Sequence, residues 1–589
     1  MADSVEESRE AGAAGPVARD RQMLADAAGQ GLPAQLRAFL KLSGPGWVQS
    51  AVTLGGGSLG SALYLGVLGG YSLMWLQPLA MIMGVIMLSV IGYVTLSTGE
   101  RPFVAINQHV NPLLGWSWAI AVALANVIWC MPQHSLSYSV LSQNLLPSSL
   151  FGEGGSLATW ATGAMGDSAF ASQFDKYLIA AVILMLCTAI TWSYDRGSWG
   201  LKLYETVLKI VVALIVLCFF GVVVRLSFSS AGLDWGAVFA GLVPDFGQMF
   251  RPADSFVPFL DAVGPAGDPA RDFWSGYIVA QQNDIIIAAA ATAVGINMTF
   301  LYPYTLLRKG WTKEFRGLAI FDLSTSMFVP FILATGCVVI ASAAQFHTKP
   351  PTGFSMEEGA AALATDEAEP GYKAFEKLIK DKRNPALPGA GDPSEAELTL
   401  AAVLVKRDAL DLAAALEPLT GRVVGNYVFG FGVLAMVLST ISVLMLMSGT
   451  VIAEMLNYPP GGWAHRFGTL VTGVGGVLWP IFWADASSNF YLSVVASVFG
   501  FMLLPFAYVT FSWLLNSKAL LGDEMPRGGK RLLINTLVFA SALLTTVGAV
   551  YKIWDKAKVG GLVVLGCFVL LVIVVAINQR NTRLQQEAG

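Results

Sequence analysis

Long apolar stretches alternate with short polar loops along most of this chain. One of them, residues 74–96 (MWLQPLAMIMGVIMLSVIGYVTL), is long enough to cross a lipid bilayer as one helix. A helix satisfies every backbone hydrogen bond within its own segment, as a bilayer requires, and the ~10-residue alternation of membrane β-strands is not seen. The pattern therefore predicts an all-α polytopic membrane protein. We expect about twelve spans, near 46–68, 74–96, 114–140, 176–194, 203–224, 284–306, 317–343, 424–452, 467–485, 490–515, 532–551 and 559–577.

The composition supports a chain embedded in the lipid bilayer. Of the 589 residues, 55% are hydrophobic and only 13% are charged, about half the charged fraction of an ordinary soluble protein. The formal net charge of −4 argues against a nucleic-acid partner, which would require a concentrated basic face. No apolar signal-peptide core occurs in the first forty residues. Residues 1–41 are predicted to be a largely disordered cytoplasmic leader.

Basic residues in the loops predict the orientation of the chain. Lys and Arg favour the cytoplasmic side, and they gather in the loops that share a side with the N-terminus, whereas the loops at 69–73 and 148–175 on the opposite side have none. Lys552, Lys556 and Lys558 depart from this pattern. The balance predicts an integral multi-pass protein of the plasma or inner membrane, with both termini in the cytoplasm.

The expected spans divide into two groups of five and a final pair. The predicted parts are a first repeat at 42–226, an extracellular insertion at 227–283, a second repeat at 284–515 that contains another extracellular insertion at 344–421, and two spans with a cytoplasmic tail at 516–589.

Two capping patterns mark expected helix starts. In the second insertion, Ser394-Glu395-Ala396-Glu397 is a capping box, which predicts an amphipathic helix over residues 398–416. Asp284 precedes the apolar part of the sixth span and is expected to cap it, because a negative charge complements a helix N-terminus.

Two of the expected spans contain interruptions. Gly55-Gly56-Gly57-Ser58 lies in the middle of the first, and each glycine weakens a helix by roughly 1 kcal/mol relative to alanine. The sixth span, ATAVGINMTFLYPYTLL, contains Gly295, Asn297, Thr299 and Pro303. One interpretation is close helix packing through small residues. The other is a pair of discontinuous helices, one and six, at matching positions of two inverted five-helix repeats, with a solute site between them at the bilayer midplane.

Several stretches resemble the natural resistance-associated macrophage protein (Nramp) family of metal-ion transporters. They are Gly44-Pro45-Gly46 with Ser50, the glycine break and Gly70-Tyr71, then residues 416–454, and more loosely 295–310 and 341–347. The resemblance covers roughly residues 42–515. It implies an inverted 5+5 repeat of the kind found in sodium-coupled amino-acid symporters (the LeuT type), followed by about two extra C-terminal helices.

This chain departs from the metal-binding motifs of the family. The first-span motif Asp-Pro-Gly-Asn is matched here by Gly55-Gly56-Gly57-Ser58, and the sixth-span motif Met-Pro-His by Thr299-Phe300-Leu301, with Met298 one residue away. A glutamine common in the eighth span of the family falls near Leu438. A dehydrated divalent cation needs anionic or several hard oxygen ligands, so the metal ligands are left unassigned. The residues expected to face the solute are Gly55, Gly56, Gly57, Ser58, Asn297, Met298, Thr299 and Phe300.

Two ionisable groups within the spans are candidate proton carriers, since intramembrane ionisable residues are functional candidates by default. His134 lies in CMPQHSLSYS of the third span, and an imidazole exchanges protons near neutral pH. The resemblance implies that the third span contributes to proton movement. Asp322 in the seventh span is the second candidate. A satisfied buried imidazole is the alternative interpretation of His134.

These observations favour a secondary transporter that works by alternating access. No GxxxxGK[ST] phosphate loop and no HExxH motif occurs, so neither an ATP-driven pump nor an enzyme is expected, and no cofactor is predicted. The expected partners are the lipid bilayer, a small solute or ion, and protons as a coupling ion. The resemblance implies metal-ion transport. Transport of a monovalent ion or of a neutral or zwitterionic solute is the alternative, as is a membrane sensor or scaffold that transports nothing.

Overall fold

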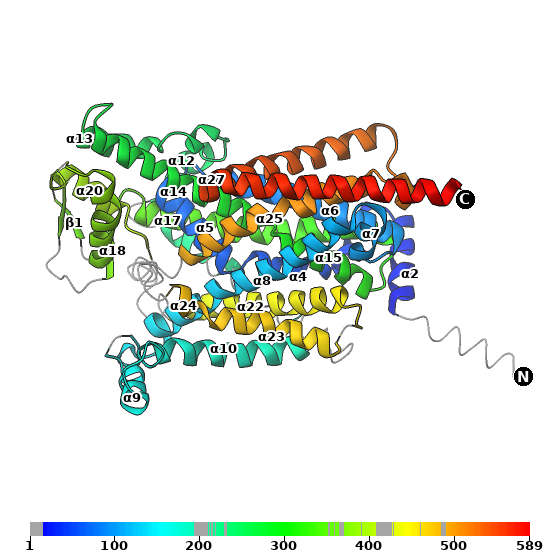
Figure 1. The fold of residues 1–589 in the computed structure, drawn as a ribbon, viewed down its shortest axis with the longest axis horizontal. Coiled ribbons are helices and arrows are strands. Elements are labelled where there is room, and N and C mark those ends of the chain that lie inside the picture. The colour runs from blue at the N-terminus through cyan, green and yellow to red at the C-terminus, as the bar shows by residue number, and fades with distance from the viewer. Residues whose placement is uncertain are drawn as a thin grey trace, which may run out of the picture.

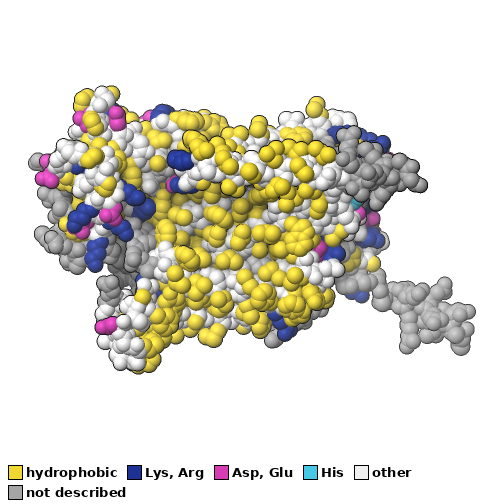
Figure 2. All heavy atoms as spheres, viewed as in Figure 1, with side chains coloured by type: hydrophobic (Ala, Val, Ile, Leu, Met, Phe, Trp, Pro, Cys, Tyr) yellow, Lys and Arg dark blue, Asp and Glu magenta, His cyan; other side chains and the backbone are white. Residues whose placement is uncertain are grey.

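A computed structural model describes residues 16–588, apart from 153, 194–205, 207–209, 211–212, 214–215, 218–219, 229–231, 352–353, 358–359, 364–369, 390, 408–426, 428, 460 and 484–490. The long helices form an elongated bundle (Figure 1). The short helices α9 (Ser156–Met165), α18 (Pro370–Leu378) and α20 (Glu395–Val403) lie at one end of it, and α2 (Pro16–Gly29) lies at the other, where α27 (Gly528–Ala588) ends. Figure 2 shows apolar side chains across the middle of this face and charged side chains mainly toward its ends.

The bundle is all-helical at its centre, as predicted. Eight helical runs among the described residues are long and apolar enough to cross a membrane, or nine with one bent pair. The runs are α6 (Leu76–Thr98), α8 (Pro112–Val140) with the π-helical η1 (Leu141–Leu145), α10 (Phe174–Ser193), α14 (Pro269–Ala293) with α15 (Ile296–Arg308), α16 (Arg316–Asp322) with η7 (Leu323–Phe328) and α17 (Val329–Phe346), α22 (Phe429–Met455), α25 (Tyr491–Leu515), and α27.

The nine runs counted among the described residues and the twelve predicted spans differ at three places. The ninth corresponds to α23 (Trp463–Val477) and α24 (Trp479–Trp483), which are individually too short to count. The last two are merged in α27, where Lys558 with φ 49° and ψ −139° breaks the helical backbone. The fifth, near 203–224, lies largely outside the described residues.

Helices one and six are discontinuous. Helix one consists of α4 (Pro45–Thr53) and α5 (Gly56–Gly69), which meet at Leu54 and Gly55 with a bend of 51°. In helix six, α14 ends before Val294 and α15 starts after Gly295, and both of these residues have extended backbones. An extended residue cannot continue the helical hydrogen-bond ladder. The central expectation of two broken helices is therefore confirmed.

Two expectations about helix ends were wrong. Asp284 does not cap helix six: α14 begins fifteen residues earlier, at Pro269, and the Asp268 carboxylate caps it by accepting from the amide of Ala270. Asp284 instead lies within α14 and pairs with Lys552 and Lys556 of α27. The sequence pattern could not show this, because residues 269–283, a mixture of polar and apolar side chains, extend the helix beyond its continuous apolar part.

The capping box at Ser394 and Glu397 is present as predicted and opens α20. This helix ends at Val403 rather than near residue 416, because residues 405–407 leave the helical conformation; residues 408–416 lie outside the described part of the chain. In the same insertion, β1 (Phe354–Glu357) and β2 (Ala360–Leu363) pair antiparallel, with Phe354 opposite Leu363.

Short elements connect the larger ones. They are α3 (Leu32–Leu42), α7 (Pro102–His109), η2 (Ser148–Leu150), η3 (Ala171–Gln173), α12 (Trp235–Ala240), η4 (Phe246–Met249), η5 (Asp254–Phe256), α13 (Val257–Val263), η6 (Lys313–Phe315), η8 (Ile379–Arg383), α19 (Asn384–Ala386), α26 (Lys518–Leu521) and η10 (Gly522–Glu524).

Close packing positions the two halves of helix one. α5 packs against α14, α17 and α25, and α4 packs against α22 and η7. At Gly66 of α5, an added Cβ would lie 2.0 Å from Ser342 Oγ and 2.5 Å from the Val339 carbonyl of α17. Only glycine allows this approach, so α5 is fixed against α17.

Candidate functional site

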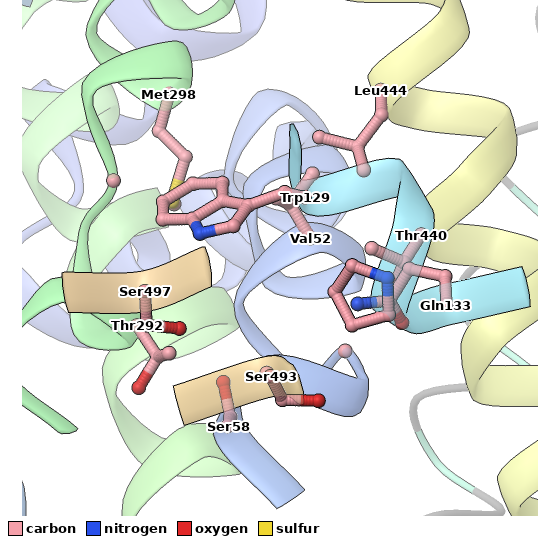
Figure 3. A pocket seen from close by; sticks show the side chains of 14 residues that line it. Val52, Ser58, Trp129, Gln133, Thr292, Met298, Thr440, Leu444, Ser493 and Ser497 are labelled. Atoms are coloured by element: carbon pink, nitrogen blue, oxygen red, sulfur yellow. The ribbon is translucent and has the colours of Figure 1, made fainter. Parts of the chain in front are cut away.

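A small cavity lies between the breaks of helices one and six (Figure 3). Its volume is ≈ 30 Å³, which is room for a water-sized occupant. Segments from both broken helices, α8, α22 and α25 surround it. The lining residues are Val52, Gly55, Gly57, Ser58, Trp129, Pro132, Gln133, Thr292, Gly295, Met298, Thr440, Leu444, Ser493 and Ser497.

Helix one contributes backbone polarity to the cavity. Gly55 is extended and precedes the first turn of α5, whose amides have no partner within the helix. An added Cβ at Gly57 would lie 3.3 Å from Thr292 Cγ2 and 3.6 Å from Ser497 Oγ, so this glycine leaves space open. The Ser58 hydroxyl donates to the Thr53 carbonyl at the end of α4, which ties the two halves of the helix together.

Helix six contributes a thioether and a second opening. The Met298 sulfur lies 3.6 Å from Thr53 Oγ1, so the two breaks are in direct contact. Trp129 of α8 covers Gly295: an added Cβ there would lie 2.1 Å from its indole ring. The break in helix six therefore requires glycine for close approach. The break in helix one does so at Gly55, where an added Cβ would lie 2.5 Å from Thr440 Oγ1.

The remaining wall is formed by hydroxyl and amide side chains. Ser493 and Ser497 of α25 are buried, and their hydroxyl oxygens have no hydrogen-bond partner within the described residues. Buried polar groups normally have partners, so these two hydroxyls are available to an occupant of the cavity. On the opposite side, Gln133 Oε1 accepts from the amide of Gly56 at 3.0 Å.

The electrostatic character of the cavity is neutral. None of its lining residues is charged at neutral pH, and no group of three or more His, Cys, Asp or Glu side chains is arranged to hold a metal ion within the described part of the chain. The fields present come from helix ends: the N-termini of α5 and α15 carry partial positive charge, and the C-termini of α4 and α14 carry partial negative charge.

Half of the residues expected to face the solute do line the cavity. Gly55, Gly57, Ser58 and Met298 are among them, whereas the Gly56 amide is occupied by Gln133.

The other three expected residues on α15 point elsewhere. Asn297 accepts from the backbone amide of Met298, Thr299 accepts from the Trp118 indole at 3.0 Å, and Phe300 stacks on Tyr304 with ring centroids 4.6 Å apart. Successive helical residues are rotated by about 100°, so only one of four neighbours faces the cavity.

Several lining residues were not identified from the sequence. Thr440 of α22 lines the cavity, two residues from Leu438, the position matched to the glutamine of the family. Thr292, Ser493 and Ser497 come from helices whose rotation the sequence does not fix. The available signal was the presence of hydroxyl residues within otherwise apolar runs.

The two candidate proton carriers lie outside the cavity lining. His134 is buried, and its Nδ1 lies 3.0 Å from the Cys130 carbonyl. Gly476 of α23 packs against the ring, because an added Cβ would lie 2.5 Å from Nδ1. Nε2 has no hydrogen-bond partner within the described residues.

Asp322 has several hydrogen-bond partners. Its carboxylate accepts from the amide of Gly46 at 2.6 Å, from the amide of Gly44 at 3.4 Å, and from the hydroxyls of Ser43 and Ser326. It therefore holds the N-terminus of α4 against helix seven, which consists of α16, η7 and α17, at the point where the π-helical turn η7 begins.

A second and larger cavity lies further along α15 and α22. Its volume is ≈ 590 Å³, and its walls include Leu301 and Thr305 of α15 and Leu446 and Thr450 of α22. These positions lie roughly half a turn to two turns beyond Met298 and Leu444 of the small cavity. They lie toward the end of α15, which is followed by Gly310, where an added Cβ would lie 3.1 Å from Val17 of α2.

Residues 46–368 and 397–555 match the model of the natural resistance-associated macrophage protein-like (Nramp) family. The chain belongs to the Nramp family. It is a multi-pass membrane protein of a secondary transporter family and not an enzyme. Comparison with curated proteins finds no match.

Solved structures of an Eremococcus coleocola manganese transporter share the fold. A mutant of that transporter has a TM-score of 0.59 at 13% identity, and its complex with an aromatic bis-isothiourea substituted compound has a TM-score of 0.58 at 13% identity. Each match covers 92% of this chain and 94% of the other. The predicted all-α polytopic fold of the Nramp family is thereby confirmed.

Proposed function

We propose that this Nramp protein carries a metal cation by alternating access, and that the cation binds in the cavity between the two helix breaks. The observation that carries the proposal is that both breaks meet in one cavity with the hydroxyls of Ser493 and Ser497, which have no hydrogen-bond partner among the described residues. Family membership supports a metal ion as the solute, as does the likeness to a protein named as a manganese transporter.

The neutral lining sets the expected mode of binding. Hydroxyl oxygens, freed backbone carbonyls and the Met298 thioether do not balance the charge of a divalent ion, and a carboxylate would normally do so. The cation therefore keeps part of its hydration shell, and its affinity is weak. A partly hydrated ion exceeds a cavity of ≈ 30 Å³, so binding requires α5 or α15 to move apart from the surrounding helices.

The same lining favours a second candidate, a small zwitterionic or neutral solute. Helix N-termini and helix C-termini both meet the cavity. The N-termini suit anionic groups, whereas freed carbonyls suit cationic ones. A monovalent ion fits the same neutral oxygens.

Flux into proteoliposomes tests these proposals. Purified full-length protein is assayed with Mn²⁺, Mg²⁺, Na⁺, K⁺ and a set of amino acids, and Gly57→Phe is compared with Gly57→Ala. The phenylalanine fills the cavity and abolishes flux, whereas the alanine, whose Cβ meets Thr292 at 3.3 Å, retains it. Gly163→Phe, at an exposed glycine with nothing within 4 Å, serves as the size-matched control.

The outcomes separate the candidates. Mn²⁺ or Mg²⁺ flux blocked by Gly57→Phe supports the metal proposal, and amino-acid flux with the same block replaces it with the second candidate. Absence of flux for every solute favours a membrane sensor or scaffold. Flux that Gly57→Phe leaves intact places the pathway outside this cavity.

A further inference from the structure

Three helices that line the cavity continue toward the end of the bundle where α20 lies. They are α5, α14 and α25, and they pack against one another. On α5, Gly57, Ser61 and Tyr64 share one face because they are spaced four and three residues apart. Ser61 is fully buried, and its hydroxyl has no hydrogen-bond partner within the described residues. With Ser493 and Ser497, this hydroxyl extends the polar wall of the cavity outward along α5.

Two tyrosines close the outer end of this polar wall. Tyr64 of α5 and Tyr491, the first residue of α25, pack edge to face with ring centroids 5.3 Å apart. Tyr491 also donates to Gln281 Oε1 of α14 at 2.9 Å. The contacts of these residues therefore connect the outer ends of the three helices.

A short segment of the second insertion covers the tyrosines. We call residues 403–407, at the end of α20, the strap. The Tyr64 hydroxyl donates to the Arg407 carbonyl of the strap at 2.6 Å, and the Lys406 ammonium lies 3.4 Å from the centroid of the Tyr491 ring. Arg407 also donates to the Lys349 carbonyl, just beyond α17. The strap thus lies across the outer ends of α5 and α25.

Buried contacts hold the strap in place. Glu397 of α20 forms a two-point pair with Arg383, with both nitrogen–oxygen distances at 3.0 Å, and accepts from the indole of Trp274 on α14 at 3.2 Å. All three side chains are buried. α20 is therefore fixed to both its own insertion and α14, and the strap continues directly from the end of this anchored helix.

Among the described residues, the acidic groups near Lys406 are already paired with other lysines. Asp284 of α14 is already paired with Lys552 and Lys556, and Lys552 and Lys556 also pair with Asp555. These four groups sum to zero, so among the described residues Lys406 and the buried Arg407 of the strap contribute positive charge at the closed end of the polar wall.

We infer that Lys406 is a specificity-determining residue at the extracellular entrance to the cavity, where its ammonium group opposes cations and favours solutes that carry an anionic group. This inference rests on the proposed function in taking the polar wall as the solute route, and among the proposed solutes it favours the zwitterionic candidate over the metal cation. A fixed charge in a narrow, low-dielectric passage changes the local concentration of charged solutes by tenfold or more.

Chemical modification of a cysteine in the route tests the inference without a known substrate. Full-length Ser61→Cys protein in proteoliposomes is treated from outside with a cationic reagent, trimethylammonium-ethyl methanethiosulfonate, and an anionic reagent, sulfonatoethyl methanethiosulfonate. The rate at which each reagent modifies the cysteine is divided by the rate at which the same reagent modifies a free thiol in solution. The ratio of anionic to cationic rates is compared between chains with Lys406, Lys406→Met and Lys406→Glu.

We expect the ratio to fall about tenfold in Lys406→Met and further in Lys406→Glu. Lys377→Met removes an exposed lysine of α18 and is expected to leave the ratio at Ser61→Cys unchanged. In a second control the cysteine is placed at Ser172, an exposed site before α10. The ratio of rates at Ser172→Cys is expected to be the same in all three Lys406 backgrounds. Equal ratios in all three Lys406 backgrounds would overturn the inference. So would the absence of reaction at Ser61→Cys in every background, because the route would then not open to the outside.

The reagent rates do not depend on solute flux, so this experiment and the Gly57 experiment fail separately. Loss of all flux with a Lys406-dependent reagent ratio refutes the proposed function alone. Flux blocked by Gly57→Phe, with a ratio that ignores Lys406, refutes this inference alone.

Discussion

Replacement of Asp322 by asparagine is expected to release α4 from helix seven. Asp322 is fully buried, and its carboxylate accepts hydrogen bonds from the amides of Gly44 and Gly46 and from the hydroxyls of Ser43 and Ser326. Asparagine has nearly the same volume but carries no charge, and it offers one acceptor oxygen in place of two. Asp322→Asn therefore removes an anion from the N-terminus of α4 and leaves at least one of its donors without a partner.

Two contributions set the size of this effect. A negative charge at a helix N-terminus contributes about 0.3–2 kcal/mol, and a hydrogen bond to a charged group contributes about 1.5–3 kcal/mol. Since part of the hydrogen bonding survives in the asparagine variant, we expect a loss of about 2–4 kcal/mol in the docking of α4. At 1.4 kcal/mol for each tenfold change, this is roughly 30- to 700-fold in the docking equilibrium.

Hydrogen–deuterium exchange of residues 46–53 measures that equilibrium. Their amides are expected to exchange faster by the same factor in Asp322→Asn, while those of α6 do not change. Ser324→Ala is the matched control, because Ser324 lies two residues away and its hydroxyl donates only to the Ile320 carbonyl. Exchange of α4 at the wild-type rate in Asp322→Asn would refute the proposed role of the carboxylate in holding α4.

Four further outcomes are expected. Burial raises the pKa of the Glu397 carboxyl, but hydrogen bonds from Arg383, Ser394 and Trp274 outweigh burial and hold the pKa below its usual range. The carboxylate therefore stabilises α20 at neutral pH. The protection of the amides of residues 395–403 from exchange should fall only below about pH 4. Arg383→Met should cost about 3–5 kcal/mol in the stability of the insertion, and unchanged protection in that variant would contradict the buried pair. Burial lowers the pKa of Lys406 to about 8, with Asp284 opposing and Lys382 adding to the shift, so protonation disfavours docking of the strap beside Tyr491 below pH 8. Protection of the strap should therefore rise between about pH 8 and 10 and show no such rise in Lys406→Met; a pH-independent wild type would exclude it. If His134 relays the coupled proton, His134→Gln should lose the acceleration of flux by an inward proton gradient and keep downhill flux, whereas an unchanged response would exclude the relay.

Local energetics explain why the sequence predicted the spans and both helix breaks. Apolar length determines which segments suit a bilayer, and glycines such as Gly55 and Gly295 allow the extended backbone that interrupts a helix. The capping box at Ser394 and Glu397 is likewise a property of four adjacent residues. Each of these features is decided by neighbours in the chain, so no knowledge of packing was needed.

Tertiary packing decided which side chains meet at the breaks. Four consecutive residues of α15 were expected to face the solute, but helix rotation brings only Met298 to the cavity, and Ser493 and Ser497 arrive from a helix about two hundred residues later in the chain. Asp322 and Asp284 acquired partners on segments far away in sequence. Helix rotation and register depend on the summed packing of all neighbouring helices, and a single helix's own sequence does not contain that information.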